Sequence, residues 1–230
     1  MKMKDNFFPK YIKNYRGPLL HKWKHYFDIY ESHLSKYRNK SPKILEIGVY
    51  HGGSLKMWKE YFGEGTKIFG VDINPNSKQA ESKDIQIIIG DQKNRKFLKK
   101  LKKRIGLVDI LIEDGGHTME QQITTLQELY QMVDTPGTIL IEDVHTSYWK
   151  EYGGGFRKKG TFIQYSKDLV DSLNENHIRS DGFFRSNKKM VLDNQFNSDF
   201  YSMSFYDSIV AIEKKEKEIP RPIRIGDKIY

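Results

Sequence analysis

The stretch from residue 108 to residue 149 constrains the fold of this chain more than any other. It contains two short apolar runs, Val108–Ile112 and Thr138–Ile141, and two acidic residues follow each run. The residues between the runs follow a helical pattern of apolar positions. A strand, a helix and a second strand in this order predict a βαβ unit with parallel strands. Both acidic pairs are therefore expected at the same edge of one sheet.

The acids at this edge are suited to a divalent metal ion. Open α/β sheets bind ligands at the carboxyl ends of their strands, and hard cations such as Mg²⁺ select carboxylate oxygen. Asp114, Glu142 and Asp143 could supply three ligands. Glu113 is a weaker candidate, because neighbouring residues of a strand point to opposite faces. A single strand-end acid would more often cap a helix or form a salt bridge, but two acidic pairs favour a metal site.

Two histidines accompany these acids. His117 follows Asp114 by three residues, and His145 lies in a polar and aromatic run with Tyr148. An unperturbed histidine titrates near ~6.5, so His117 could accept a proton from an alcohol whose pKa a bound metal has lowered. His117 could instead cap the helix or order water. His145 and Tyr148 are interpreted as lining a substrate site.

The first half of the chain predicts a turn of the kind that binds nucleotides. Lys43–Val49 is a candidate buried strand, and the glycine-rich sequence Tyr50–Ser54 and a helical pattern follow it. Glycines allow close backbone approach, and a helix N-terminus carries partial positive charge. The glycine spacing departs from the dinucleotide fingerprint, so the motif by itself is not specific. Asp72, after a second strand at Lys67–Val71, is placed to bind ribose hydroxyls, although it could also cap the next helix.

The remaining patterns complete a doubly wound α/β fold. A third strand is expected at Ile85–Ile89 and a basic helix at Lys93–Arg104, so strands and helices alternate as far as residue 141. This alternation predicts a mostly parallel sheet. Residues 200–205 and Ser208–Glu213 alternate like a closing antiparallel hairpin, which gives seven strands in total. Residues 179–199 are expected to be irregular.

We expect a single domain over residues 1–230. The aromatic pattern of residues 19–38 predicts an amphipathic helix, and residues 1–40 are interpreted as a helical cap over the sheet or a ligand. The glycine-rich residues 153–160 are interpreted as a flexible loop beside the site. The charged tail, residues 215–230, contains proline and is expected to be extended.

Composition excludes several classes of protein. The chain has no cysteine, so disulfides and thiolate metal sites are ruled out. No window approaches the ~18 consecutive apolar residues of a membrane span, and a cytoplasmic protein is expected. The net charge of +9 would suit nucleic acid, an anionic membrane surface or an acidic small substrate. The basic run at residues 93–104 is interpreted as a solvated helix face, because no aromatic side chains alternate with its cations to stack bases.

Two groups of motifs resemble a known family. Glu46-Ile-Gly48, Gly52-Gly53-Ser54, Asp72 and Gly90-Asp91 resemble the cofactor half of class I S-adenosylmethionine-dependent methyltransferases. The sequences DGGH, QQITTLQEL and IEDVHTSYW, between residues 114 and 149, resemble the metal-dependent O-methyltransferases that act on sugar hydroxyls of macrolides, as in mycinamicin biosynthesis. Cephalosporin-tailoring proteins share this layout. The similarity covers most of residues 41–214 and implies a Rossmann-like methyltransferase fold.

The resemblance also implies roles for individual residues. A divalent ion, usually Mg²⁺, would be held by Asp114, Glu142 and Asp143, and His117 would be the general base. The S-adenosylmethionine contacts would be Glu46, Gly48, Ser54, Asp72, Ile73, Asp91 and Gln92. The macrolide enzymes carry an additional N-terminal region, so a simpler sugar, free or linked to a nucleotide, lipid or polysaccharide, is the expected substrate, with sugar acids among the candidates.

Three functions remain open from the sequence. The first is methyl transfer from S-adenosylmethionine to a sugar hydroxyl, with a non-sugar natural product as a variant substrate. The second is a nucleic-acid methyltransferase or binding module, which the net charge motivates and the acidic pairs oppose. The third is a non-catalytic scaffold that keeps a cofactor fold, which the intact set of acids and His117 opposes. A homo-oligomer is compatible with each of the three.

Overall fold

The computed structural model describes residues 7–174, 177, 196 and 199–230. Most of the segment that was expected to be irregular, residues 179–199, therefore lies outside the described residues. The description covers both acidic pairs, the glycine-rich turn and the two strands of the hairpin.

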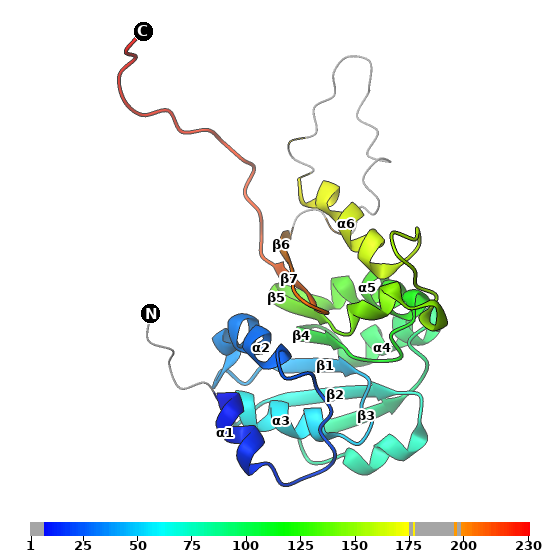
Figure 1. The fold of residues 1–230 in the computed structure, drawn as a ribbon. Helices are drawn as coiled ribbons and strands as arrows, with labels where there is room; N and C mark the ends of the chain where they lie inside the picture. The colour runs from blue at the N-terminus through cyan, green and yellow to red at the C-terminus, as the bar shows by residue number, and fades with distance from the viewer. Residues whose placement is uncertain (1–6, 175–176, 178–195, 197–198) are drawn as a thin grey trace.

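The described residues form one seven-stranded sheet in the order β3-β2-β1-β4-β5-β7-β6 (Figure 1). The strands are β1 (Lys43–Ile47), β2 (Lys67–Asp72), β3 (Ile85–Ile89), β4 (Val108–Glu113), β5 (Val133–Ile141), β6 (Phe200–Phe205) and β7 (Val210–Lys214). Strands β1 to β5 are parallel, whereas β7 pairs antiparallel with both β5 and β6. The predicted doubly wound, mostly parallel sheet with a closing antiparallel hairpin is confirmed.

Strand β5 begins earlier than the sequence suggests. The apolar run predicted a strand from Thr138, but β5 starts at Val133 and includes the cis peptide bond that precedes Pro136. Val133 pairs with Val108 of β4, and Thr138 pairs with Ile110. Between these pairs, four residues of β5 oppose a single residue of β4, so the strand contains an irregularity ahead of the predicted apolar run.

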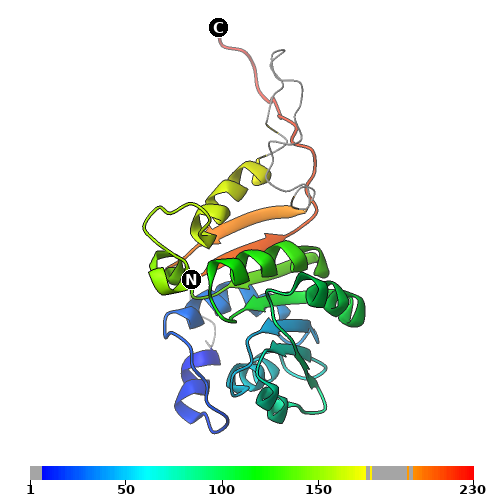
Figure 2. The same ribbon diagram turned by 90° about the vertical axis from the view of Figure 1, so that its right-hand side faces the viewer.

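Helices cover both faces of the sheet (Figures 1 and 2). Three of them, α1 (Phe7–Asn14), α2 (Tyr26–Leu34) and α3 (Gly53–Phe62), pack in one apolar core, and α4 (Arg95–Ile105), α5 (Met119–Leu129) and α6 (Phe162–Leu173) pack in the other. Short 3₁₀ helices are η1 (Ser35–Tyr37), η2 (Pro75–Ala80), η3 (Tyr130–Met132), η4 (Val144–Tyr148) and η5 (Lys150–Tyr152). In β1, Ile44 belongs to the first core and Leu45 to the second, as the alternation of a strand requires.

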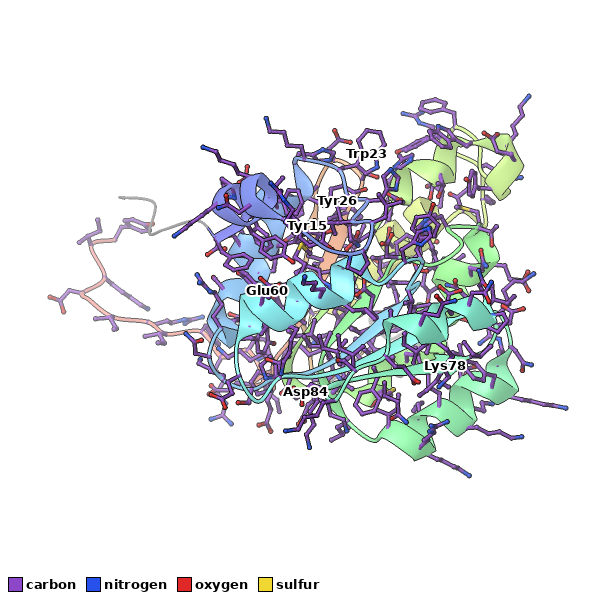
Figure 3. The ribbon with its side chains drawn as sticks, turned by 90° about the horizontal axis from the view of Figure 1, so that it is seen from below. Tyr15, Trp23, Tyr26, Glu60, Lys78 and Asp84 are labelled. Carbon is purple, nitrogen blue, oxygen red and sulfur yellow. The ribbon has the colours of Figure 1, made fainter. Side chains whose placement is uncertain are left out.

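The helix predicted over residues 19–38 is shorter than expected. Helix α2 begins only at Tyr26, and residues 15–25, which we call the strap, contain neither helix nor strand. The strap crosses the N-terminus of α3, where a Cβ on Gly53 would lie 2.3 Å from the carbonyl oxygen of Leu19. At the start of the strap, Tyr15 lies beside α3 (Figure 3), and Lys56 Nζ is 5.7 Å from its ring centroid. Contact with α3 therefore replaces the first turns of the predicted helix.

The basic run forms a helix, as predicted. Helix α4 buries Leu98, Leu101 and Ile105, and the side chain of Asn94 caps it by accepting a hydrogen bond from the backbone N–H of Phe97 at 3.1 Å. At the C-terminus of the chain, residues 215–230 contain no helix or strand and extend away from the sheet (Figure 1). Within the part of the chain that is described, no helix combines the length and apolar character needed to cross a bilayer.

Candidate active site

A cavity of about 560 Å³ opens at the carboxyl ends of the central parallel strands. Its size is within the range of pockets that bind small molecules and cofactors. Of the seven residues predicted to contact a cofactor, six line this cavity: Gly48, Ser54, Asp72, Ile73, Asp91 and Gln92. The seventh, Glu46, is fully buried behind the cavity, where its Oε2 accepts a hydrogen bond from Trp58 Nε1 at 3.0 Å. Burial raises the pKa of Glu46 to about 7.

The glycine-rich turn between β1 and α3 shapes one wall of this cavity. Gly48 adopts φ +94°, and a Cβ at this position would lie 1.9 Å from the backbone oxygen of Asp114. Glycine therefore allows the end of β1 to touch the end of β4. Asp72 Oδ2 accepts hydrogen bonds from the backbone N–H groups of Val49 and Tyr50, both at 2.9 Å. The carboxylate of Asp72 thus orders the turn from the neighbouring strand.

Gln92 braces the loop that carries the DGGH motif. Its Nε2 donates to Glu113 Oε1 at 2.7 Å, and its Oε1 accepts from the backbone N–H of Gly116 at 2.9 Å. A Cβ on Gly115 would lie 2.0 Å from the same Oε1, so a side chain there would displace the Gln92 amide. Glu113 does not line the cavity, and burial raises its pKa to about 8. Glu113 therefore supports the DGGH loop through Gln92 and does not face the cavity as a metal ligand would.

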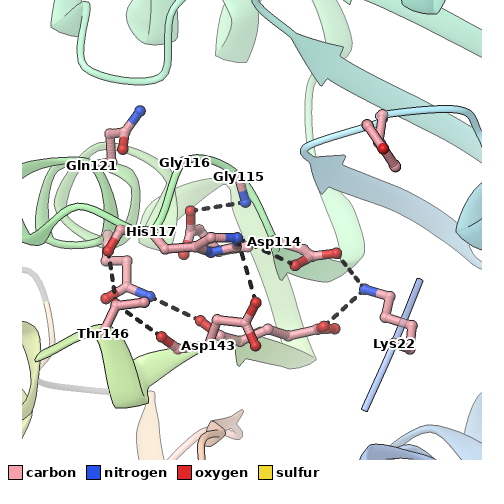
Figure 4. A network of polar contacts seen from close by, with 12 residues as sticks. Lys22, Asp114, Gly115, Gly116, His117, Gln121, Asp143 and Thr146 are labelled. Atoms are coloured by element: carbon pink, nitrogen blue, oxygen red, sulfur yellow. Dashed lines mark hydrogen bonds and ion pairs between the residues drawn. The ribbon is translucent and has the colours of Figure 1, made fainter. Parts of the chain in front are cut away.

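Three side chains at the carboxyl ends of β4 and β5 could hold a metal ion. Asp114, His117 and Asp143 each offer one ligand atom, and these atoms lie within 4.8 Å of one another. His117 Nε2 is 3.4 Å from Asp143 Oδ2 and 4.0 Å from Asp114 Oδ1 (Figure 4). His117 and Asp143 both have positive φ, at 56° and 54°. Such backbone conformations are uncommon outside glycine and gather at functional sites.

Behind these three residues, Lys22 of the strap enters the acidic cluster (Figure 4). Its Nζ donates to Asp114 Oδ2 at 2.6 Å and to Glu142 Oε2 at 2.8 Å, and it lies 3.7 Å from Glu46 Oε1. The other oxygen of Glu142 accepts a hydrogen bond from Tyr30 at 2.8 Å. Burial lowers the pKa of Lys22, but Asp114 and Glu142 outweigh this effect and hold that pKa well above its usual value. The contacts with Asp114 and Glu142 therefore favour the charged ammonium form of Lys22.

The three predicted metal ligands thus lie close together, but their carboxylate oxygens point toward different partners. Asp114, Glu142 and Asp143 all line the cavity, as their positions after β4 and β5 predicted. Asp114 and Asp143 present an oxygen toward His117, whereas both oxygens of Glu142 contact Lys22 and Tyr30. The donor set of carboxylates and an imidazole fits a divalent cation.

Sequence reasoning did not identify three residues that hold this cluster. They are Lys22, Tyr26 and Tyr30, and Tyr26 donates a hydrogen bond to Asp143 Oδ1 at 2.6 Å. Several buried acids at one edge of a sheet require a buried cation nearby, so the acidic pairs in the sequence already indicated that a lysine or arginine would pair with them. The acidic pairs could not select Lys22 from the 39 lysines and arginines of the chain, because the expected helix gave no reason to bury it.

Aromatic side chains form the outer rim of the cavity. His145 lines it, and the ring centroid of His145 is 5.8 Å from that of Trp23 and 4.6 Å from that of Trp149. Tyr148, which was predicted to line the substrate site with His145, is about half exposed and is not among the lining residues. The chain turns after η4, so Trp149 and Tyr152 reach the rim in its place.

The fold and the sequence comparisons agree on the class of protein. Residues 45–144 match the family model of the methyltransferase domain, and the sheet has the Rossmann-like methyltransferase arrangement. Two curated relatives are the demethylmacrocin O-methyltransferase of Streptomyces fradiae, 37% identical, and the mycinamicin VI 2''-O-methyltransferase of Micromonospora griseorubida, 36% identical. Each alignment covers 66% of this chain and 40% of the relative, so the chain spans about two fifths of their length.

A solved structure extends this similarity to most of the chain. The MycE methyltransferase of the mycinamycin biosynthetic pathway, in complex with Mg, SAH and mycinamycin VI, superimposes with a TM-score of 0.76 and 28% identity. The match covers 96% of this chain and 56% of MycE. The resemblance to the macrolide sugar O-methyltransferases, which the sequence motifs predicted, is therefore confirmed.

Proposed function

We propose that the protein is an O-methyltransferase that uses S-adenosylmethionine and a divalent ion to methylate a sugar hydroxyl. The observation that carries this proposal is the contact between Gly48 and Asp114. It joins a glycine-rich cofactor turn to a group of potential metal ligands within one cavity. The similarity to sugar O-methyltransferases, one of them solved with Mg and SAH, supports the same assignment.

Asp114 and Asp143 are proposed to hold the ion, with Glu142 as the third acid of the cluster. A divalent ion at this position would lower the pKa of a sugar hydroxyl bound to it. Gly48, Ser54, Asp72, Ile73, Asp91 and Gln92, which line the cavity, are proposed to contact S-adenosylmethionine, the source of the methyl group. Glu46 would support this region from behind, through its contact with Trp58.

His117 is proposed to accept the proton of the reacting hydroxyl. Its Nε2 faces Asp114 and Asp143, and its Nδ1 is buried without a hydrogen-bond partner among the described residues. S-adenosylmethionine, when bound, would supply its methyl group to the deprotonated oxygen, and its sulfur would keep the electron pair of the broken bond.

The substrate is proposed to be a small sugar or glycan that carries an acidic group. The aromatic rim of Trp23, His145 and Trp149 offers flat surfaces against which a sugar ring could pack. At long range, the net charge of +9 attracts an anionic substrate to the molecule as a whole. A phosphate or carboxylate on the sugar or its carrier would provide that charge.

Mass spectrometry of reaction products tests the proposed function. The protein would be incubated with S-adenosylmethionine and a panel of sugar acids, nucleotide sugars and glycans, with Mg²⁺ and with a chelator. We expect a product heavier by one methyl group that forms with Mg²⁺ and disappears in the chelator. Full activity in the chelator, in protein shown by metal analysis to be free of divalent ions, would refute the proposed metal dependence.

A further inference from the structure

Two adjacent residues of the strap, Lys22 and Trp23, reach different parts of the proposed active site. Trp23 is about half exposed at the rim of the cavity, whereas the side chain of Lys22 is only 2% exposed within the acidic cluster. Leu19 and His21 of the strap also line the cavity. Because the strap has no regular hydrogen-bonded structure, its position depends on its contacts with α3 and with the acids.

The Lys22 ammonium divides the acidic cluster into two parts. One oxygen of Asp114 and one of Glu142 accept its hydrogen bonds, at 2.6 and 2.8 Å. The other oxygen of Asp114 and the carboxylate of Asp143 remain directed toward the proposed ion position, with His117 beside them. Lys22 therefore binds two of the three acids that the sequence motifs assign to the metal ion.

We propose that Lys22 is a tethered cation that competes with the divalent ion for Asp114 and Glu142. The inference rests on the proposed function, because it requires that a divalent ion binds this cluster. Two cations held a few ångströms apart repel strongly inside a protein, where the effective dielectric constant is well below that of water. An ion that binds Asp114 and Glu142 must therefore either tolerate this repulsion or displace Lys22.

Displacement of Lys22 would couple metal binding to the shape of the cavity. The backbone of Lys22 is continuous with Trp23, and the ring of Trp23 contacts the side of the rim that His145 forms. Movement of the ammonium out of the cluster thus shifts the rim against which the substrate is proposed to pack. In the absence of metal, Lys22 compensates buried acids that would otherwise be unpaired, which keeps the cluster assembled.

A purely structural role for Lys22 predicts the opposite effect on metal affinity. If Lys22 only fixed the side chains of Asp114 and Glu142, its removal would loosen these ligands and weaken metal binding. If Lys22 competes with the ion, its removal frees one oxygen of each acid and abolishes the repulsion, which tightens metal binding. The direction of the change separates the two roles.

Calorimetric titration of the full chain with Mn²⁺ tests the inference. Lys22→Met removes the charge and retains a side chain of similar length, and Lys24→Met, at an exposed position of the same strap, makes the same charge change away from the acids. We expect Lys22→Met to bind Mn²⁺ at least about tenfold more tightly than the unmodified chain, and Lys24→Met to stay within about twofold. Unchanged or weaker binding by Lys22→Met would overturn the inference.

A double-mutant cycle identifies the acid for which Lys22 competes. Glu142→Gln should weaken Mn²⁺ binding more in the Lys22→Met background than in the unmodified chain, because Lys22 occupies Glu142 only in the latter. Equal effects in both backgrounds would contradict competition for Glu142. If Lys22→Met does not fold, hydrogen exchange of the unmodified chain decides: Mg²⁺ should speed exchange of amides in residues 19–25, and slower or unchanged exchange would oppose displacement.

The titration also separates this inference from the proposed function. If the unmodified chain and Lys22→Met bind Mn²⁺ equally well, the proposed metal site stands and the competition is refuted. If neither binds Mn²⁺, the metal-dependent function itself fails, and the inference fails with it. If only Lys22→Met bound Mn²⁺, Lys22 would be shown to exclude the ion from the unmodified chain, which would support the inference.

Discussion

Gly48 is the residue at which the two halves of the proposed active site meet. It directly follows β1 and has a positive φ, and its missing side chain leaves room for the backbone oxygen of Asp114. The cofactor turn and the proposed metal ligand are thereby held at a fixed separation. The sequence placed Gly48 in a candidate strand and, through the family resemblance, among the cofactor contacts. The structure adds its close approach to Asp114, which follows the neighbouring strand β4.

Replacement of Gly48 and of a matched control glycine separates two losses of folding stability: the loss from overlap with Asp114 and the loss from a positive φ at a residue other than glycine. Gly48→Ala should destabilise the fold by about 3 kcal/mol, because backbone strain adds to an overlap with Asp114 that neither strand can relieve easily. Gly160→Ala is the matched control, since Gly160 also has positive φ but no atom lies within 4 Å of its added Cβ. That control should lose only about 1 kcal/mol. Urea denaturation measures both, and equal losses would mean that the contact is unimportant.

His117 allows a test of the proposed proton transfer. His117→Ala should lower turnover by about 10²- to 10⁴-fold, the usual contribution of a general base. Calorimetry should show S-adenosylmethionine affinity within about twofold of the unmodified chain, because the proposed cofactor residues lie on other strands and turns. His177→Ala, at an exposed position, serves as the control and should leave turnover unchanged. Turnover that survives His117→Ala would assign the proton to another acceptor.

At the scale of elements, α2 is anchored to the antiparallel end of the sheet through Glu213 of β7. His33 of α2 lies 2.7 Å from Glu213 Oε1, Thr138 of β5 donates to Oε2 at 2.9 Å, and Lys36 also pairs with this carboxylate. Burial raises the pKa of Glu213, but these hydrogen bonds and the charge of Lys36 outweigh it and hold the pKa below its usual value. The same helix supplies Tyr26 and Tyr30 to the acidic cluster, so this anchor positions part of the active site.

The lowered pKa of Glu213 predicts how its removal depends on pH. A carboxyl group with a lower pKa in the folded state stabilises the protein above its unfolded pKa, near ~4.3, and loses this contribution as the pH falls through the folded value. Glu213→Gln should therefore cost about 1–3 kcal/mol at pH 7 and progressively less below pH 4. Urea denaturation at pH 7 and pH 3 measures the difference, with the exposed Glu216→Gln as control. A cost that does not change with pH would exclude the ionised carboxylate as its source.

At the scale of the whole molecule, the sequence predicted the sheet more completely than the site. Each parallel strand was visible as an apolar run, and the acids at the ends of β4 and β5 had to meet because parallel strands end at one edge. The strap could not be predicted, since its position depends on Gly53 and the acids, both distant in sequence. Its aromatic spacing suited a helix equally well. The place of Lys22 was therefore available only from the structure.

The distribution of positive charge also becomes clear only in the whole molecule. Helix α4 follows β3 in a βαβ unit, so it runs away from the edge that bears the cavity, and its basic last turn lies toward the opposite edge. The cavity itself contains the acidic cluster. The basic run is therefore poorly placed to guide a nucleic acid to the proposed site of methyl transfer.

Neutralising the end of α4 tests whether this charge matters for activity. Replacement of Lys102, Lys103 and Arg104 by Gln should leave methyl transfer to a small acidic sugar within about twofold. Any retardation of RNA or DNA by the unmodified chain should fall steeply with added salt, and the triple variant should weaken it with a shallower salt dependence, because fewer counterions are released. Both measurements are needed on the same preparations. If the variant instead lost methyl transfer along with nucleic-acid binding, the basic face would belong to the substrate path, and a nucleic acid would replace the sugar as the favoured substrate.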